Sequence, residues 1–273
     1  MTQSNEIQIS RFTISTNALK ILAIIAMVSD HLPYLSEYAH INYYSIPTVF
    51  MHAFGRITAP VFFYLLALGY RRTRNPNKYT IRLFVFALIS YVPFIWYFEG
   101  GPPDSYNFLK LNVIFTMLFG LLMIRSIDEV QNIVLKAAAI FLCLLAGFWT
   151  DYGLFGLGMI LVCHLAGESR KRTIFGLGAV IMVQFYTNTS AFFSDGVSPF
   201  NYGPMLFQNP NLIGYIFILL CQLLPLIFIS RHIVWFRGAK AEKKPHFLAK
   251  WGFYIFYPAH ITLLLLFRLM VLS

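Results

Sequence analysis

Residues 18–36 read ALKILAIIAMVSDHLPYLS, an apolar stretch long enough to cross a bilayer that nevertheless contains Asp30 and His31. A carboxylate beside an imidazole is costly at membrane depth and is rarely retained there without a function. The stretch therefore predicts two features together: a transmembrane helix, and a chemical centre within the bilayer.

The whole chain has the composition of a membrane protein. Of its 273 residues, 58% are hydrophobic and 12% are charged, whereas about a quarter of the residues in a soluble protein are charged. Apolar runs of roughly 17–25 residues recur along the chain. They cover residues 18–36, 46–70, 79–98, 109–126, 131–149, 152–167, 173–191, 211–230 and 251–271. We expect an all-α, polytopic helical membrane protein of about nine transmembrane helices (eight to ten), forming a single domain over residues 1–273.

The distribution of charge predicts the orientation. All but Arg56, Lys110 and Arg268 of the 21 Lys and Arg residues fall in segments on one side of such a bundle. The positive-inside rule makes this side cytosolic. The N-terminus with its polar residues 1–17 is then cytosolic, the C-terminus lies outside, and residues 231–250 form a basic cytosolic loop. Topology explains the net charge of +10, so no nucleic acid is expected as a partner. The three cysteines fall within apolar runs, and neither a disulfide framework nor a metal site is expected.

Counting residues brings several polar side chains to one depth. At a rise of ~1.5 Å per residue, His31 lies about 16 Å from Lys20 at the cytosolic boundary. Arg56 lies about 16 Å from the outer end of its span, and His260 about 15 Å from the cytosolic end of its own. All three are then near the middle of a ~30 Å hydrocarbon core. Asp30 is the acid at this depth, and Arg56 is its natural partner because a guanidinium can bind a carboxylate bidentately.

The residue types at this depth leave several functions open. A neutral histidine can remove a proton from an acceptor group, and an arginine can stabilise negative charge in a transition state, which suits acyl transfer. The same groups suit proton-coupled secondary transport with Asp30 and His31 as the relay. An ion pair between Asp30 and Arg56 that only holds two helices together, in a structural assembly protein, is a third interpretation.

A set of short motifs then follows in order along the chain. They are LKI (19–21), SDH (29–31), RITAPVF (56–62), Tyr79 and Arg82-Leu83, FALISYVPF (86–94), NVIFT (112–116), DYGLFG (151–156) and KWGFYIFYPAH (250–260). The ordered set resembles the TraX family, whose namesake is linked to N-terminal acetylation of conjugative pilin in bacteria. The similarity covers residues 18–272. One departure is Tyr91, where that family often has an acid after the serine.

The resemblance implies an enzyme. The TraX family is similar to multispanning acyltransferases that take acyl groups from acyl-CoA on the cytosolic side and use a membrane-embedded histidine. The implied protein lies in the bacterial cytoplasmic (inner) membrane. It would move an acetyl group from cytosolic acetyl-CoA to an amine or hydroxyl of a pilin N-terminus, another peptide or a glycan.

Catalytic roles follow from the resemblance by position. His31 is expected to be the general base, and Asp30 to orient it or to pair with Arg56. Arg56 would stabilise charge near the acyl carbonyl. His260 is either a second acid–base group or a wall of the acyl tunnel.

Binding roles are expected at both ends of the bundle. Asn112 would hydrogen-bond the thioester or the acceptor, although an asparagine within a span also commonly joins helices. Asp151 is placed to meet an acceptor from outside, or else to cap a helix end. The basic residues expected to bind the phosphates of CoA are Lys20, Arg71, Arg72 and Arg82.

Overall fold

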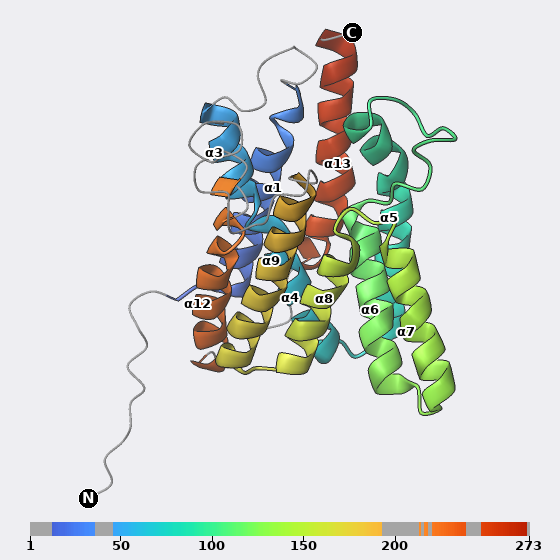
Figure 1. Cartoon of the computed structure of the whole chain (residues 1–273), viewed down its shortest axis with the longest axis vertical. Coiled ribbons are helices and arrows are strands. Elements are labelled where there is room, and N and C mark those ends of the chain that lie inside the picture. The colour runs from blue at the N-terminus through green and yellow to red at the C-terminus, as the bar shows by residue number, and fades with distance from the viewer. Residues whose placement is uncertain are drawn as a thin grey trace, which may run out of the picture.

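The computed structural model describes residues 13–35, 46–192, 220–238 and 247–271, together with residues 213, 216 and 217. Its helices run up and down a single bundle (Figure 1). They are α1 (Thr16–His31), α3 (Ile46–Gly55), α4 (Thr58–Arg72), α5 (Pro76–Phe98), α6 (Val113–Glu129), α7 (Ile133–Gly147), α8 (Gly153–Ala166), α9 (Arg170–Phe192), α12 (Leu224–Gly238) and α13 (Phe247–Val271). No strand forms among the described residues, so the predicted all-helical class is confirmed for this part of the chain.

Three segments of the described chain are long and apolar enough to cross a membrane. They are Ile46–Arg72, which joins α3 and α4, Pro76–Phe98 (α5) and Trp251–Val271 within α13. Shorter apolar helices occupy Ile133–Gly147, Gly153–Ala166 and Leu224–Phe236. The chain therefore has the features of a membrane protein, and crossing by the remaining helices stays a prediction.

The eighth predicted span differs from the structure. We expected a span at 211–230 and a loop at 231–250, but α12 covers Leu224–Gly238 and α13 begins at Phe247. Most of residues 211–219 lie outside the described residues. The helix continues past the polar residues that end the hydropathy run because they find partners inside the bundle. Ser230 accepts a hydrogen bond from Arg170 Nε at 2.7 Å, and His232 lies 2.9 Å from the hydroxyl of Tyr64.

Helix α4 forms the centre of the bundle. It packs against α8, α1, α6 and α12, and most of its side chains are buried, among them Val61, Phe63 and Leu66. The helix α7, in contrast, exposes large apolar side chains such as Ile133 and Phe141 along its outer face. Exposed apolar surface of this kind is stable against lipid, which supports a location in the bilayer.

Two arginines cap the C-terminal ends of neighbouring helices by donating hydrogen bonds to their last backbone carbonyl oxygens. Arg71 Nη1 donates to the carbonyl oxygen of Cys163 at 2.9 Å and its Nη2 donates to that of Gly167 at 3.2 Å, at the end of α8. Arg268 donates to the carbonyl oxygens of Trp96 at 3.0 Å and Gly100 at 3.2 Å, at the end of α5. The last carbonyls of a helix lack partners within the helix, so these contacts satisfy groups that lipid cannot.

The two ends of the bundle differ in charge. The α4–α5, α6–α7 and α8–α9 connections lie at the lower end in Figure 1, where α1 begins. This lower end holds Arg71, Arg72, Arg125 and Arg170. The α5–α6 and α7–α8 connections lie at the upper end, near which α13 finishes. The basic residues are thus gathered at one end of the bundle, in agreement with the charge pattern from which we predicted the orientation. That this end faces the cytosol stays a prediction.

Candidate functional site

A polar cavity of about 290 Å³ opens near the upper end of the bundle. It forms where α1 ends, where α3 gives way to α4, where α5 ends and where α8 begins. Its lining residues are Asp30, His31, Tyr34, Arg56, Phe94, Phe98, Glu99, Asp151 and Tyr152. Three of these are carboxylates, and four of them carry aromatic rings other than imidazole. The cavity therefore combines charge with apolar walls, as sites for small substrates do.

Asp30 is held by two basic side chains, one from the end of α3 and one from the turn between α3 and α4. Its Oδ1 accepts hydrogen bonds from His52 Nδ1 at 2.9 Å and from Arg56 Nη2 at 3.2 Å. Arg56 is in this position because the chain breaks between α3 and α4, where Arg56 and Ile57 form a turn. Gly55 precedes the break, and a Cβ atom there would lie 2.3 Å from the Cβ of Asp30. The absence of a side chain at residue 55 therefore allows Asp30 to approach its partners.

His31 and His260 form a hydrogen-bonded pair whose direction can be deduced. His31 Nδ1 lies 2.8 Å from His260 Nε2, and His260 Nδ1 lies 2.9 Å from the carbonyl oxygen of Phe256. A carbonyl only accepts, so His260 Nδ1 carries the hydrogen, and in the neutral ring its Nε2 must accept. His31 Nδ1 is then the donor, which leaves a lone pair on His31 Nε2. Because His31 lines the cavity, the pair presents a base to it.

Contacts from α5 fix the backbone and the ring of His31. The hydroxyl of Tyr97 donates to the carbonyl oxygen of His31 at 2.8 Å, at the end of α1. The ring of Phe98 meets the imidazole of His31 edge to face, with 5.0 Å between centroids, and contacts the ring of Tyr34 at 4.8 Å. The base is therefore held by packing as well as by its hydrogen bond to His260.

Asp151 reaches the same cavity from the connection between α7 and α8. Two backbone hydrogen bonds to Leu111 fix this connection. Asp151 N donates to the carbonyl oxygen of Leu111 at 2.8 Å, and Leu111 N donates to that of Trp149 at 2.8 Å. The surrounding protein desolvates the Asp151 carboxyl and raises its pKa to about 6, and the negative charge of Asp30 adds to the rise. This carboxyl therefore changes charge close to neutral pH.

Asn112, expected to bind substrate, is used inside the fold. Its side chain is buried, its Oδ1 accepts from Ile114 N at 3.0 Å as the N-cap of α6, and its Nδ2 donates to the carbonyl oxygen of Ala87 at 3.0 Å. It does not line the polar cavity. Capping and joining of α5 to α6 account for both of its polar groups.

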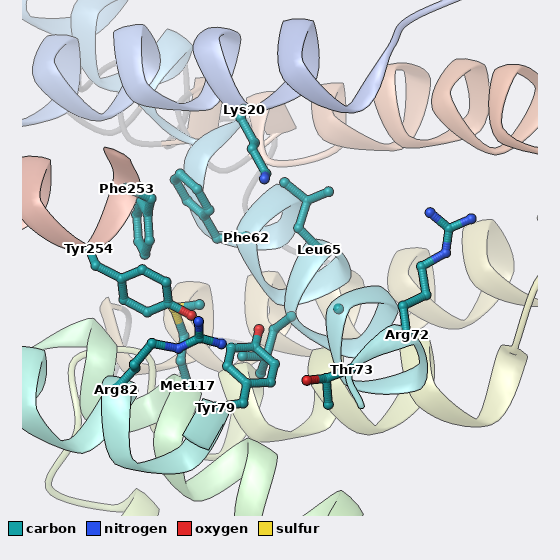
Figure 2. Close-up of a pocket in the computed structure, with 12 residues that line it drawn as sticks. Lys20, Phe62, Leu65, Arg72, Thr73, Tyr79, Arg82, Met117, Phe253 and Tyr254 are labelled. Atoms are coloured by element: carbon teal, nitrogen blue, oxygen red, sulfur yellow. The ribbon is translucent and has the colours of Figure 1, made fainter. Parts of the chain in front are cut away.

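A second cavity, also of about 290 Å³, is shown in Figure 2. It lies toward the lower end of the bundle, because its lining includes the first turns of α1 and α5 and the last turn of α4. It includes Lys20, Arg72 and Arg82, which are three of the four residues expected to bind CoA phosphates. Arg82 lies among the rings of Tyr79, Trp251 and Tyr254, with its guanidinium carbon 5.5–5.8 Å from their centroids. A basic cavity with aromatic walls suits a phosphorylated ligand that carries a ring.

Arg71 departs from this expectation. It does not line the lower cavity, because its guanidinium is committed to the carbonyl oxygens at the end of α8. A basic residue after an apolar run has the same appearance in the sequence whether it caps a neighbouring helix or faces a ligand.

The two cavities have no lining residue in common. Phe62 of α4 and Phe253 of α13 line the lower cavity, and their rings pack against each other at an angle of 33°, with centroids 3.9 Å apart (Figure 2). Phe62 is six residues from Arg56 and Phe253 is seven residues from His260. These separations correspond to about 10 Å along the chain between this wall of the lower cavity and the polar groups.

The predicted grouping of Asp30, His31, Arg56 and His260 agrees with the geometry, and Asp151 joins them. Several contributors were not predicted. His52 binds Asp30, and its place one turn before Arg56 was the signal in the sequence that it could do so. Glu99 also lines the cavity. It follows the last residue of α5, and the sequence of a connection does not indicate which way a side chain points. Among the described residues, no group of three or more His, Cys, Asp or Glu side chains is placed to hold a metal ion.

Comparison with known proteins adds independent information. The family model described as TraX protein matches residues 15–268. A protein of Dichelobacter nodosus, the probable fimbrial assembly protein FimC of serogroup H1, is 28% identical over 254 residues, which are 90% of this chain and 92% of the relative. No solved structure matches the chain with statistical significance.

Proposed function

The chain belongs to the TraX family, and from this premise we propose that it is a membrane-embedded acyltransferase that moves an acetyl group from acetyl-CoA to an amine or hydroxyl acceptor. The observation that carries the proposal is the pair formed by His31 and His260, whose hydrogen bonds leave an unprotonated nitrogen at the polar cavity. The relative named as a fimbrial assembly protein supports a role in modifying surface proteins. A pilin N-terminus, another peptide and a glycan are the proposed acceptors, and the bacterial cytoplasmic membrane is the proposed location.

The lower cavity is the proposed donor site. Lys20 and Arg82 bring positive charge to the cavity, and the phosphates of CoA carry the complementary charge (Figure 2). Arg72 also lines the cavity, but its guanidinium lies over the ring of Phe236, 3.7 Å from the ring centroid. The rings of Tyr79 and Tyr254 supply apolar walls beside these cations. If this end faces the cytosol, as the charge pattern predicts, acetyl-CoA reaches it directly.

The polar cavity is the proposed site of transfer. His31 Nε2 takes a proton from the acceptor amine or hydroxyl as the acceptor attacks the acetyl carbonyl carbon. A C–N or C–O bond forms, the C–S bond of the thioester breaks, and the proton on His31 passes to the leaving thiolate. His260 stabilises the transient imidazolium by accepting the hydrogen bond from His31 Nδ1.

Arg56 and Asp30 support this step electrostatically. The Arg56 guanidinium places positive charge at the cavity wall, where negative charge develops on the carbonyl oxygen during attack. Asp30 holds Arg56 through the 3.2 Å contact, and His52 holds Asp30 from the other side. The arrangement is preorganised, so little reorganisation accompanies the reaction.

A donor bound in the lower cavity must bring its thioester past the tilted ring pair of Phe62 and Phe253, which lines that cavity. We propose that binding of the donor separates these rings and so connects the lower cavity with His31. Two helices carry side chains of both sites: α1 carries Lys20 and His31, and α13 carries Tyr254 and His260.

The test is binding and transfer with purified protein in detergent. We expect calorimetry to show saturable binding of acetyl-CoA and weaker binding of free pantetheine, which lacks the nucleotide phosphates. In a transfer assay with radiolabelled acetyl-CoA and a primary amine, His31→Ala should bind the donor and transfer nothing measurable. His164→Ala is the matched control, because His164 pairs with Asp128 at 3.1 Å and lines neither cavity.

Absence of acetyl-CoA binding up to millimolar concentration would contradict the proposal. Gradient-driven flux of a substrate without affinity for CoA would then favour the transporter that uses Asp30 and His31 as a proton relay.

A further inference from the structure

An apolar groove leads from the outer surface of α6 and α7 toward the polar cavity. It has a volume of about 450 Å³ and is lined on α6 by residues such as Phe119 and Leu122, and on α7 by Cys143, Ala146 and their neighbours. Its walls are almost entirely carbon and sulfur, because its lining side chains are Leu, Phe, Cys, Ala and Trp. The proposed mechanism makes no use of this groove.

A third cavity lies between the groove and the site and adjoins both. This outer cavity, also about 450 Å³, shares Leu109, Leu111 and Trp149 with the groove. It shares Phe94, Glu99 and Asp151 with the polar cavity. The apolar groove, the outer cavity and the polar cavity that His31 lines are therefore successive neighbours with common walls.

The outer cavity has the properties of a head-group site. Lys110 lies 3.6 Å from Glu99, and Asp151 lines the same space, so the cavity holds charge of both signs. The ring of Trp149 lies at its junction with the groove. Tryptophan at the boundary between apolar and polar surroundings is typical of membrane interfaces.

The length and the lining of the groove favour one kind of occupant. Its lining residues run from 142 to 149, over the end of α7 and the connection after it, and from Leu111 to Leu122. These ranges correspond to about 11–17 Å along the helix axes. A long apolar groove that ends beside a cavity with charged walls matches an amphiphile, with a hydrocarbon chain in the groove and a polar head group in the cavity.

We propose that the acceptor is lipid-linked: its amine or hydroxyl lies in the outer cavity and reaches His31, while one hydrocarbon chain occupies the α6–α7 groove. The inference rests on the proposed transferase function and narrows its acceptor to molecules that arrive sideways from the bilayer. A peptide or glycan qualifies when it is attached to such a chain.

Photo-crosslinking tests occupancy of the groove without requiring catalysis. The probe is a long-chain primary amine with a diazirine near its methyl end, added to the full-length protein in detergent. We expect cross-links at residues 142–149 and 119–122 that unlabelled long-chain amine suppresses and propylamine does not. Ala146→Trp should reduce them at least tenfold because the indole fills the groove. Leu144→Trp is the matched control, since Leu144 lies on the same helix outside the groove and is 36% exposed.

Acetyl transfer then separates this inference from the function on which it rests. We expect Ala146→Trp to raise the KM for the long-chain amine at least tenfold and to leave transfer to propylamine and acetyl-CoA binding unchanged, which also shows that the variant is folded. Ala146→Phe should give a smaller effect of the same sign.

The outcomes are distinct. Equal KM values for both amines, unaffected by Ala146→Trp, would overturn the groove proposal while the transferase stands. Absence of transfer to either amine would contradict the proposed transferase function. The cross-linking experiment would then decide by itself whether a hydrocarbon chain occupies the groove. Displacement of the probe by an apolar helical peptide but not by a long-chain amine would assign the groove to a protein partner and would also overturn the proposal.

Discussion

Substitution of Gly55 by alanine is the sharpest structural test of the site. The added Cβ would lie 2.3 Å from Cβ, 2.6 Å from Cγ and 2.7 Å from Oδ1 of Asp30. Ordinary contact begins near 3.4 Å, so Asp30 or the end of α3 must move by about 1 Å. The contacts of Asp30 with His52 at 2.9 Å and Arg56 at 3.2 Å cannot both survive this movement.

The size of the effect follows from these contacts. Overpacking typically destabilises by about 1–3 kcal/mol, and a hydrogen bond to a charged group contributes about 1.5–3 kcal/mol. Because the side chains relax in part, we expect Gly55→Ala to lower the free energy of unfolding by about 2–4 kcal/mol. This corresponds to a decrease of about 5–15 °C in Tm for a chain of this length. A displacement of about 1 Å at a reacting centre lowers a rate about 100-fold.

Thermal unfolding followed by fluorescence and the radiolabel transfer assay measure the two effects. Gly252→Ala is the matched control because no atom lies within 4 Å of its added Cβ. Gly120→Ala separates stability from activity, since its Cβ would meet Ile160 at 2.3 Å, away from Asp30. It should lower Tm and preserve transfer per folded molecule. Wild-type Tm and wild-type transfer in Gly55→Ala would refute the placement of Asp30 against Gly55.

Three further predictions follow from charged groups. The pKa of Asp151 is raised from 3.8 to about 6, so the folded protein binds the proton more tightly than the unfolded chain, and ionisation of this carboxyl destabilises the fold as pH rises from 4 to 6. Asp151→Asn should therefore match the wild-type Tm near pH 4 and exceed it above pH 6; a constant difference across this range would contradict the shift. Arg82→Gln should raise the Kd for acetyl-CoA about tenfold by calorimetry, whereas Arg71→Gln should lower Tm with little change in Kd; the reverse pattern would exchange their roles. Arg268→Gln removes the donors to the end of α5, so hydrogen exchange at residues 96–100 should accelerate about tenfold or more. Lys110→Gln, which loses only a 3.6 Å exposed ion pair, is its control.

Much of the fold could be predicted because lipid imposes a simple rule on the chain. Backbone groups in a bilayer must pair within a segment, so each long apolar run becomes a helix. The predicted bounds were wrong at the eighth run, where a span at 211–230 and a loop at 231–250 were expected but α12 covers Leu224–Gly238 and so includes Ser230 and His232. Their partners, Arg170 and Tyr64, come from other helices, and hydropathy contains no information about such contacts.

Depth along a helix predicted the centre of the site because rise per residue is nearly constant. It correctly grouped Asp30 with Arg56 and His31 with His260. Rotation about the helix axis and the path of connections are set by packing, so the same arithmetic could not find Glu99. Arg71 was assigned to the CoA phosphates as one of the basic residues at the predicted cytosolic end, and sequence cannot distinguish such a residue from one that caps a neighbouring helix.

The connection between α5 and α6 is anchored at both ends by backbone contacts. Arg268 binds the carbonyl oxygen of Gly100 at its beginning, and Leu111 exchanges two backbone hydrogen bonds with the segment before α8 at its end. Neither anchor depends on the side chains of residues 101–110, although Tyr106 and Lys110 line the outer cavity. Within the connection, the side chains of Asp104 and Asn107 hydrogen-bond its backbone, so its shape is set largely by contacts of its own. If the proposed function holds, exchange of residues 101–110 between two proteins of this family should change the preferred acceptor and leave the pair of His31 and His260 in place.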